Sequence, residues 1–373
     1  MKMEEWKECK LGEIAHFTTG KLNSNAAEDN GLYPFFTCSP ETYRINSYAF
    51  DTNAILLAGN NAEGNFNIKR YSGKFNAYQR TYVITVDDNT DLNFLFYALK
   101  LCLADFKHIS QGTATKFLTA QILNNFVIRL PPLPTQQKIA AILSSLDDKI
   151  ELNNKINTNL ELQAGALFKN WFVDIEPFGG KMPEGWKVGK LSEIADYLNG
   201  LAMQKFRPLE GEEGLPVLKI KELRQGCYDE SSELCSPSRI KPEYIIHDGD
   251  VIFSWSGSLL VDIWCGGTCG LNQHLFKVTS QTYEKWFYYL WTKHHLDRFI
   301  FLAADKATTM GHIKREELDK AEVVIPDDKT YQQLTSVIKP IIDEIINNRI
   351  ENRKLSQTRD ELLPKLMNGE IEV

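Results

Sequence analysis

The chain has 373 residues, 43% of them hydrophobic, which is enough for two domains with real cores. Its formal net charge is -7, from 42 Lys and Arg against 49 Asp and Glu. This balance argues against a nucleic-acid binder driven by bulk positive charge but allows local basic surfaces. The seven cysteines are scattered, the charged start MKMEEWKECK lacks the apolar stretch of a signal peptide, and no apolar run is long enough for a membrane span. We therefore expect a cytoplasmic protein with free thiols.

Residues 1–134 are predicted to form a first globular domain. It opens on Trp6-Lys7 and the phrase LGEIAHFTTGK, followed by short apolar runs broken by Gly, Asn and Asp, which are typical of strands and turns. An aromatic helix begins near Phe94. The loop GTATK comes next, and we expect it to open another helix.

Several polar residues of this domain are candidates for DNA contact. A loop with hydroxyls, a lysine and backbone amides at a helix start suits phosphate, although an ordinary capped helix is the alternative. In the major groove Arg pairs with guanine and Gln with adenine, so a Gln-Arg pair is a candidate base reader or, alternatively, a structural hydrogen-bonding pair. A basic cluster beside aromatic residues is a candidate for phosphate contact, and the alternative is an ordinary solvated surface. The candidates are Lys69, Arg70, Lys74, Gln79, Arg80, Gly112, Thr113, Thr115 and Lys116.

Residues 135–178 are predicted to contain a long helix from Thr135 to Phe172, a rod of roughly 55 Å at about 1.5 Å per residue. An apolar ladder with a spacing of seven residues is typical of a coiled coil. We expect Ile142 and Ile156 at the second seam position, with Leu143 and Ile150 broadening the stripe. The predicted coiled-coil or partner-contacting residues are Ile139, Leu146, Asn153, Leu160, Leu167, Phe168 and Trp171.

Residues 179–330 repeat the first domain about 195 residues later. Trp186-Lys187 leads to LSEIADYLNGL, which shares Leu, Glu, Ile, Ala, an aromatic residue and Gly with the first copy. The pair Gln-His takes the place of Gln-Arg, an aromatic helix begins at Trp286, and a polar loop follows. By the same reasoning as in the first copy, the candidate DNA-binding residues are Gln273, His274, Thr308, Thr309, His312 and Lys314.

Residues 331–373 are predicted to form a second long helix, whose ladder is Leu334, Ile341, Asn348, Leu355 and Leu362. Both ladders carry asparagine at the third rung. A polar seam residue costs stability but defines register, so Asn153 and Asn348 would meet if the helices are antiparallel. The alternative is that both face solvent.

The predicted class is α+β: two similar globular domains separated by two long antiparallel coiled-coil helices, with pseudo-two-fold symmetry. Two similar heads on a stiff spacer suit two half-sites on DNA, which repeats every ~34 Å.

The phrases LELQAGALFKNWFVD (160–174) and RDELLPKLMNGEIEV (359–373) resemble the central and C-terminal regions of specificity subunits of type I restriction-modification enzymes. PLPTQQKIAAIL and the paired openings also match, so the resemblance covers the whole chain. It implies two target recognition domains that each read one half of a bipartite sequence in double-stranded DNA, with a spacer set by the helices. It also implies that modification (methyltransferase) subunits, two of them, dock on the helices and that restriction (ATP-dependent translocase and nuclease) subunits join. Residues 112–118 and 308–313 resemble the family's small-polar loop, although the second copy departs at Met310-Gly311-His312.

The expected absences agree with a non-catalytic subunit. The sequence has no GxxxxGK[ST] phosphate loop, no glycine-rich cofactor fingerprint and no Asn-Pro-Pro-aromatic phrase, so we expect no cofactor. Cys265 and Cys269 lack further ligands at short spacing, so we expect no metal. The alternatives are a coiled-coil scaffold that joins partners without reading DNA, and a self-sufficient methyltransferase.

Overall fold

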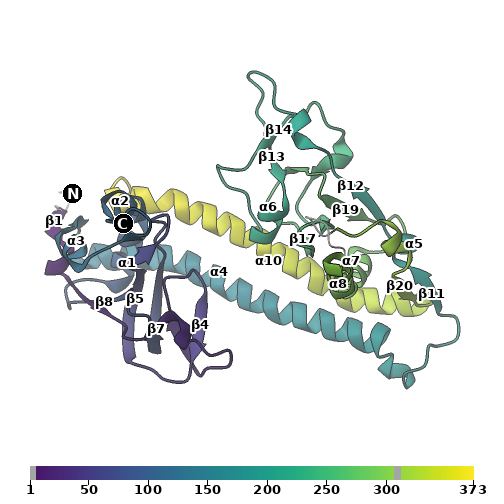
Figure 1. Cartoon of the computed structure of the whole chain (residues 1–373), viewed down its shortest axis with the longest axis horizontal. Coiled ribbons are helices and arrows are strands. Elements are labelled where there is room, and N and C mark those ends of the chain that lie inside the picture. Colours follow the sequence, from purple (N-terminus) through teal and green to yellow (C-terminus); the bar gives the residue numbers. More distant parts are fainter. Residues whose placement is uncertain (1–5, 306–311) are drawn as a thin grey trace. The chain divides into compact units, whose positions relative to one another are not determined.

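The computed structural model describes residues 6–305 and 312–373, and the chain divides into two compact units. Unit 1 comprises Met1–Asp148 and Ser356–Val373, and unit 2 comprises Lys149–Leu355. Each unit contains mixed β-sheet, short helices and part of both long helices, α4 (Leu133–Phe168) and α10 (Asp328–Asn368) (Figure 1). The predicted α+β class is confirmed.

Unit 1 is built on a six-stranded sheet with the order β2-β8-β5-β7-β3-β4. In its central strand the run from Ala54 to Ala58 is at most 2% exposed. Ile55 and Leu57 pack with the aromatic helix α1, whereas Ala54 and Leu56 pack on the other face with Phe36 and Phe75. The run is continuous rather than alternating because both faces of the strand are covered. The strands are β2 (Ala15–Thr19), β3 (Tyr33–Phe36), β4 (Thr42–Ile45), β5 (Phe50–Ala58), β7 (Ile68–Ala77) and β8 (Thr81–Val86).

Smaller elements complete unit 1. Strand β1 (Lys7–Lys10) pairs antiparallel with β10 (Val127–Leu130), and β6 (Asn60–Asn61) with β9 (Lys116–Phe117). The helices are η1 (Leu11–Glu13), η2 (Ser24–Ala26), α1 (Leu92–Leu101), α2 (Leu103–Ile109) and α3 (Ala120–Asn125).

Unit 2 repeats this topology, but its strands are divided between two sheets. Its sheets have the orders β12-β19-β16-β17 and β14-β13-β18-β15. The long β7 of unit 1 pairs antiparallel with β5 and parallel with β3, whereas in unit 2 separate strands β17 and β18 make the two equivalent pairings. The strands are β12 (Asp196–Asn199), β13 (Leu215–Leu218), β14 (Leu234–Cys235), β15 (Ile245–Ile246), β16 (Val251–Ser254), β17 (Leu260–Ile263), β18 (Cys269–Leu271) and β19 (Leu275–Thr279).

The remaining elements of unit 2 include an antiparallel pair of β11 (Lys187–Lys190) with β20 (Glu322–Ile325), which mirrors β1 and β10. The helices are η3 (Lys169–Val173, a π-helical segment), η4 (Glu176–Phe178), α5 (Leu191–Ile194), η5 (Met203–Lys205), α6 (Ile220–Gln225), η6 (Pro242–Tyr244), α7 (Lys285–His294), α8 (Leu296–Asp305) and α9 (Glu316–Asp319).

The repeated opening phrase has a local cause in both units. Glu13 accepts the backbone N–H of Lys10, at 3.0 Å, and Glu193 accepts that of Lys190, at 3.2 Å. The repeated glycine has a steric cause, since a Cβ on Gly20 would lie 1.8 Å from the carbonyl oxygen of Ala77, and a Cβ on Gly200 would lie 2.2 Å from that of Asn272. The phrase therefore encodes a capped turn and a close backbone approach.

Both long helices begin by capping the aromatic helix of their unit. Gln136 Oε1 accepts the backbone N–H of Asp91, the N-cap residue of α1, at 2.9 Å. Tyr331 Oη accepts the N–H of Glu284, the N-cap residue of α7, at 2.7 Å. The structural equivalent of Gln136 is thus a tyrosine, which directly precedes the pair Gln332-Gln333 in the second copy.

The long helices pair antiparallel within each unit, side by side in Figure 1. Of the ladder residues, Ile139, Asn153, Leu334 and Asn348 are buried and the others are half-buried. The expected second seam is wrong, because Ile142 and Ile156 are each 37% exposed. Leu143, which is buried, and Ile150, which is half-buried, lie beside the ladder as expected, and Asn157 and Ala164 are also buried there.

The third-rung asparagines are buried, which excludes the solvent-facing alternative, but they do not bond to each other. Asn348 Nδ2 donates to Asn157 Oδ1 at 2.9 Å, and Asn153 Nδ2 donates to Asn352 Oδ1 at 2.9 Å and to Glu351 at 2.7 Å. We call Asn153, Asn157, Asn348 and Asn352 the asparagine layer. It forms because Asn153 faces Asn352, one turn beyond Asn348, and Asn348 faces Asn157, one turn beyond Asn153.

Candidate nucleic-acid interface

Three segments far apart in sequence meet at one place in unit 1. The N–H of Gly59, at the end of β5, donates to the carbonyl of Arg80 at 2.8 Å, and the N–H of Leu118 donates to the carbonyl of Gly59 at 2.9 Å. Strands β6 and β9 extend this contact. The predicted Gln79-Arg80 pair and the end of the predicted polar loop are therefore neighbours, joined through the turn after the central strand.

Unit 2 builds the same junction from different residues. The N–H of Trp255, after β16, donates to the carbonyl of His274 at 3.4 Å, and the N–H of Ile313 donates to the carbonyl of Trp255 at 3.1 Å. Ser256 and His312 form the bridge that corresponds to β6 and β9. We call these two sites the unit 1 and unit 2 junctions. Gly59 and Trp255 were not among the residues predicted from the sequence, although each directly follows an apolar run, NAILLA in unit 1 and DVIFS in unit 2.

The side chains at the unit 1 junction differ in how they are engaged. Gln79 Nε2 donates to Asn23 Oδ1 at 2.9 Å, so part of its hydrogen-bonding capacity is used inside the protein. The Arg80 side chain is exposed and makes no hydrogen bond or ion pair with any residue that the structure describes. Lys107 lies nearby and donates to Asn65 Oδ1 at 2.8 Å. Arg80 is thus the cation best placed to meet an external group.

The polar loop of unit 1 does not open a helix, contrary to the prediction. Gln111 and Phe117 exchange backbone hydrogen bonds of 3.0 and 2.9 Å, so the residues between them form a tight turn. Gly112 has a φ of 96°, and a Cβ there would lie 2.1 Å from the carbonyl oxygen of Thr115. Helix α3 begins only at Ala120, and its N-cap is Thr119. Thr113 and Thr115 lie exposed at this turn and Lys116 half-buried on β9, so the loop offers side chains but no helix-terminal amides.

The basic cluster on β7 is largely occupied by the protein itself. Lys69 Nζ donates to the Glu41 carbonyl at 2.8 Å, and burial lowers the pKa of Lys69. Arg70 donates to Ser144 at 2.7 Å and pairs with Asp148 at 3.0 Å, which attaches the sheet to α4. Lys74 is exposed, with Nζ 4.7 Å from the centre of the Tyr48 ring. In this arrangement Arg70 supports the fold, and Lys74 is the member left at the surface.

At the unit 2 junction the predicted Gln-His pair is internally bonded. Gln273 Nε2 lies 3.3 Å from His274 Nε2, and His274 Nδ1 lies 3.0 Å from Ser256 Oγ. Trp255 packs its ring 6.5 Å from His274 and 6.1 Å from His312. Lys314 is exposed beside Glu316, at 3.7 Å. Thr308 and Thr309 lie outside the described residues.

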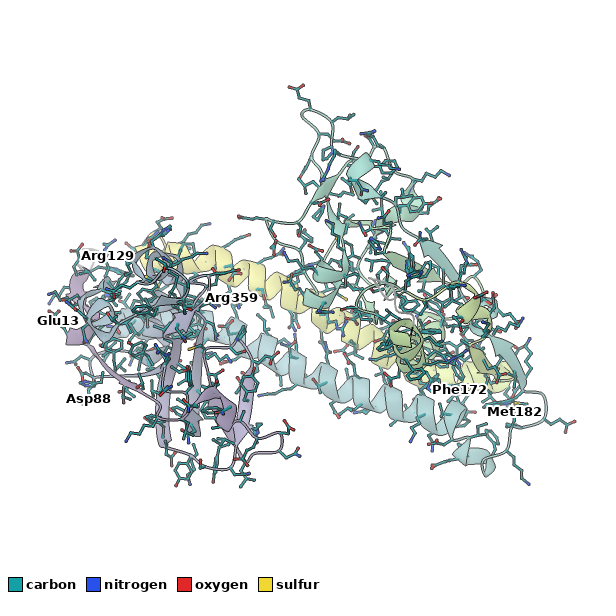
Figure 2. The ribbon with its side chains drawn as sticks, in the orientation of Figure 1. Glu13, Asp88, Arg129, Phe172, Met182 and Arg359 are labelled. Atoms are coloured by element: carbon teal, nitrogen blue, oxygen red, sulfur yellow. The ribbon has the colours of Figure 1, made fainter. Side chains whose placement is uncertain are left out.

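The end of α4 packs inside unit 2. Phe172, which is labelled in Figure 2, is 2% exposed, and its ring packs against those of Trp186, Trp286 and Trp291. Phe168 is 5% exposed and packs edge-on against Trp291, at 4.9 Å between ring centres. Trp171 is half-buried against Phe178. These aromatic side chains therefore hold the helix end to its own unit.

The described residues also bear on metal binding, thiol reactivity and membrane crossing. Residues 6–305 and 312–373 contain no group of three His, Cys, Asp or Glu side chains placed to hold a metal ion. Burial raises the pKa of the Cys265 thiol to about 11 and that of Cys269 to about 12, so both are protonated thiols near neutral pH. Within the same residues, no helix has the length and apolarity that a membrane crossing needs.

Comparison with known proteins agrees with this duplicated architecture. A family model for the type I restriction modification DNA specificity domain matches residues 3–162 and again residues 183–355. The chain is 30% identical over 309 residues to the type I restriction enzyme MjaIX specificity subunit of Methanocaldococcus jannaschii, which covers 77% of this chain and 70% of that protein. It is 42% identical over 148 residues to the type I restriction enzyme EcoDI specificity subunit of Escherichia coli, which covers 39% of this chain and 32% of that protein.

A solved structure shares the fold. The crystal structure of the S subunit of a type I restriction-modification system from M. genitalium matches with a TM-score of 0.63 and 16% sequence identity, over 98% of this chain and 97% of that one. The family match, the relatives and the fold all point the same way. The chain belongs to the family of type I restriction-modification DNA specificity subunits.

Proposed function

We propose that this protein is the non-catalytic DNA-specificity subunit of a type I restriction-modification complex in the cytoplasm. Each unit contacts one half of a bipartite target in double-stranded DNA. Two modification subunits bind this chain and methylate adenine. Restriction subunits also bind and carry out cleavage.

One observation supports DNA reading most directly: the same three-segment junction occurs in both units with different side chains. Gly59, Arg80 and Phe117 in unit 1 correspond to Trp255, His274 and His312 in unit 2. A scaffold would need the junction only for stability, whereas two readers need one backbone frame and two sets of contacting side chains. Divergence of side chains on an equivalent frame is what different half-sites require.

The long helices support the spacing part of the proposal. They pair antiparallel in both units, through Asp147 with Arg359 in unit 1 and through the asparagine layer in unit 2. Paired helices are stiffer than a flexible linker and so suit a spacer of defined length. Their outward faces, where Ile142, Leu152 and Ile156 are exposed, are available to partner helices.

The test is to assemble the chain with its modification subunits and map methylated adenines across DNA of known sequence. We expect methylation only at a two-part sequence with a fixed spacer. Methylation without such a target, in a complex shown to be intact, would contradict the proposal.

The second candidate is a coiled-coil scaffold that joins partners without reading DNA, which the large helical surface favours. It predicts that the assembled complex binds target and non-target duplexes equally. A competition binding assay at a stated salt concentration separates the two, since sequence-independent contacts alone give no preference.

A further inference from the structure

Beside the unit 2 junction lies an open recess of about 470 Å³. It is bounded by the residues that directly follow the parallel strands β13 and β18, by the start of α6 and by the Gln273-His274 pair. Its lining residues are Gln204, Lys219, Ile220, Lys221, Glu233, Asn272, Gln273 and His274.

Asn272 presents an unused hydrogen-bond donor to this recess. The residue is only 7% exposed, and its Oδ1 accepts the backbone N–H of His274 at 3.2 Å. Its Nδ2 has no hydrogen-bond partner among residues 6–305 and 312–373, and it is not sealed from solvent. A nearly buried amide with an unsatisfied donor is costly unless a ligand or water meets it.

Gln273, the next residue in the chain and also part of the recess lining, has an acceptor that the described chain does not use. Its Nε2 donates to His274 Nε2 at 3.3 Å, which makes this ring nitrogen the acceptor, and His274 Nδ1–H then donates to Ser256 Oγ at 3.0 Å. This chain of bonds holds the Gln273 amide in one orientation, and Gln273 Oε1 makes no hydrogen bond within the described chain. Side chains locked in this way are pre-organised for recognition.

The charges around the recess do not favour a free anion. Lys219 pairs with Glu233 at 2.7 Å, and Lys221 pairs with Asp229 at 3.0 Å, so both lysines are already neutralised. Recognition therefore depends on the neutral donor of Asn272 and the neutral acceptor of Gln273.

We propose, resting on the proposed function, that this recess reads one adenine of the unit 2 half-site through its major-groove edge. Adenine N7 accepts from Asn272 Nδ2, and the adenine N6 amino group donates to Gln273 Oε1. Guanine presents two acceptors, N7 and O6, so its O6 would face Gln273 Oε1 without a proton between them. Both bases can accept from Asn272 Nδ2 at N7, but only adenine can donate to Gln273 Oε1, so the recess selects adenine over guanine.

The experiment uses the complete complex and its mapped target, rebuilt as synthetic duplexes with 7-deazaadenine at one adenine at a time. This base lacks the N7 acceptor. We expect one position in one half-site at which the replacement weakens binding by the wild-type complex about tenfold, a typical loss for a single base contact. In Asn272→Asp, which keeps the acceptor for His274 but replaces the donor, the same replacement should cost nothing.

The other adenines of the target serve as controls, because their replacement should affect both complexes equally. A second variant, Gln273→Met, removes the acceptor and should allow guanine at that same position in the methylation map. The inference is wrong if no adenine replacement weakens the wild-type complex more than the Asn272→Asp complex. It is also wrong if Gln273→Met changes the methylated sequence at a position other than that adenine. Either result can occur with a bipartite target. Absence of any bipartite target would instead contradict the proposed function.

Discussion

At the residue scale, position in the fold separates side chains that the sequence presents as alike. Arg70 and Arg80 both lie near aromatic residues in one stretch of the chain. Arg70 is bound by Ser144 and Asp148, whereas Arg80 is exposed at the unit 1 junction. A guanidinium whose donors are bonded inside the protein cannot also bond a ligand in the same conformation. Substitution of Arg70 should therefore affect stability, whereas substitution of Arg80 should affect DNA binding.

We predict that Arg80→Ala relaxes the unit 1 half-site at one position. Arg reads guanine with two parallel donors, and loss of such a contact costs about 1–3 kcal/mol. Methylation mapping should show one base of one half-site becoming degenerate, with the other half-site unchanged. Lys74→Ala is the control, because an exposed lysine would contact phosphate only and its loss should weaken binding to all sequences equally. An unaltered motif with Arg80→Ala would exclude base reading by this residue.

Asp147 leads to a prediction for pH dependence. Burial alone would raise its pKa, but hydrogen bonds from Arg359 and Tyr97 outweigh this and lower the pKa below its usual value (Figure 2 labels Arg359). A carboxyl with a lowered folded-state pKa contributes stability above its unfolded pKa, about 3.9, and loses it as pH falls through the folded value.

Asp147→Asn should therefore lower the melting temperature at neutral pH. It should also make the melting temperature decrease less when the pH is lowered below about 4. Asp148→Asn is the control, since its side chain is 68% exposed and its pair with Arg70 contributes little. Melting curves of the three proteins across pH 2–7 measure this. Equal acid sensitivity of the wild type and Asp147→Asn would count against the argument.

At the element scale, the helices are held by a mixture of apolar and amide contacts. Ile338, Ile342 and Ile345 bury the apolar face of α10, and the asparagine layer follows within one turn. Asn153 Oδ1 is buried without a partner, so the layer is not fully satisfied. Such a layer costs stability and favours one register over its neighbours.

We predict that Asn157→Ala lowers the free energy of unfolding by about 1–3 kcal/mol, because Asn348 Nδ2 loses its acceptor in a buried place. The double variant Asn157→Leu with Asn348→Leu should recover most of that loss, since neither polar group is then left unpaired. Asn159→Ala, at an exposed position of the same helix, is the control and should change little. Denaturant unfolding gives the values, and a double variant as unstable as the single one would contradict the role of the pair.

At the scale of the whole molecule, the proposal makes the paired helices a ruler. Unit 1 ends within α4 at Asp148 and resumes within α10 at Ser356. One heptad inserted after Asp148 and one after Leu355 would interrupt neither unit. Seven residues add about 10 Å of helix, which corresponds to about three base pairs of DNA.

We therefore predict that the double insertion lengthens the spacer in the methylated sequence by about three base pairs and leaves both half-sites unchanged. A heptad in α4 alone is the control, because it breaks the pairing of the two helices and should abolish site-specific methylation. A spacer of the original length in an active double-insertion complex would refute the ruler.

The sequence alone determined the duplication, the two long helices and the family, because each is a local or repeated signal. A spacing of seven in Ile139 and Leu146, or a phrase such as LSEIA, survives whatever the rest of the chain does. The sequence pattern placed Ile142 at the second seam position, but Leu143 is the buried residue, because both spacings suit a helix and only the partner surface decides which side chain is buried.

Only the tertiary structure decided which distant loops meet. Gly59, Arg80 and Leu118 are joined by backbone hydrogen bonds between segments more than twenty residues apart, and these bonds leave no periodic pattern in the sequence. The helix expected at GTATK begins only at Ala120, because the backbone exchange between Gln111 and Phe117 turns the chain first and the N–H of Leu118 bonds to the distant Gly59. Periodicity records the face that a segment buries, whereas the contents of a site depend on contacts that only folding brings together.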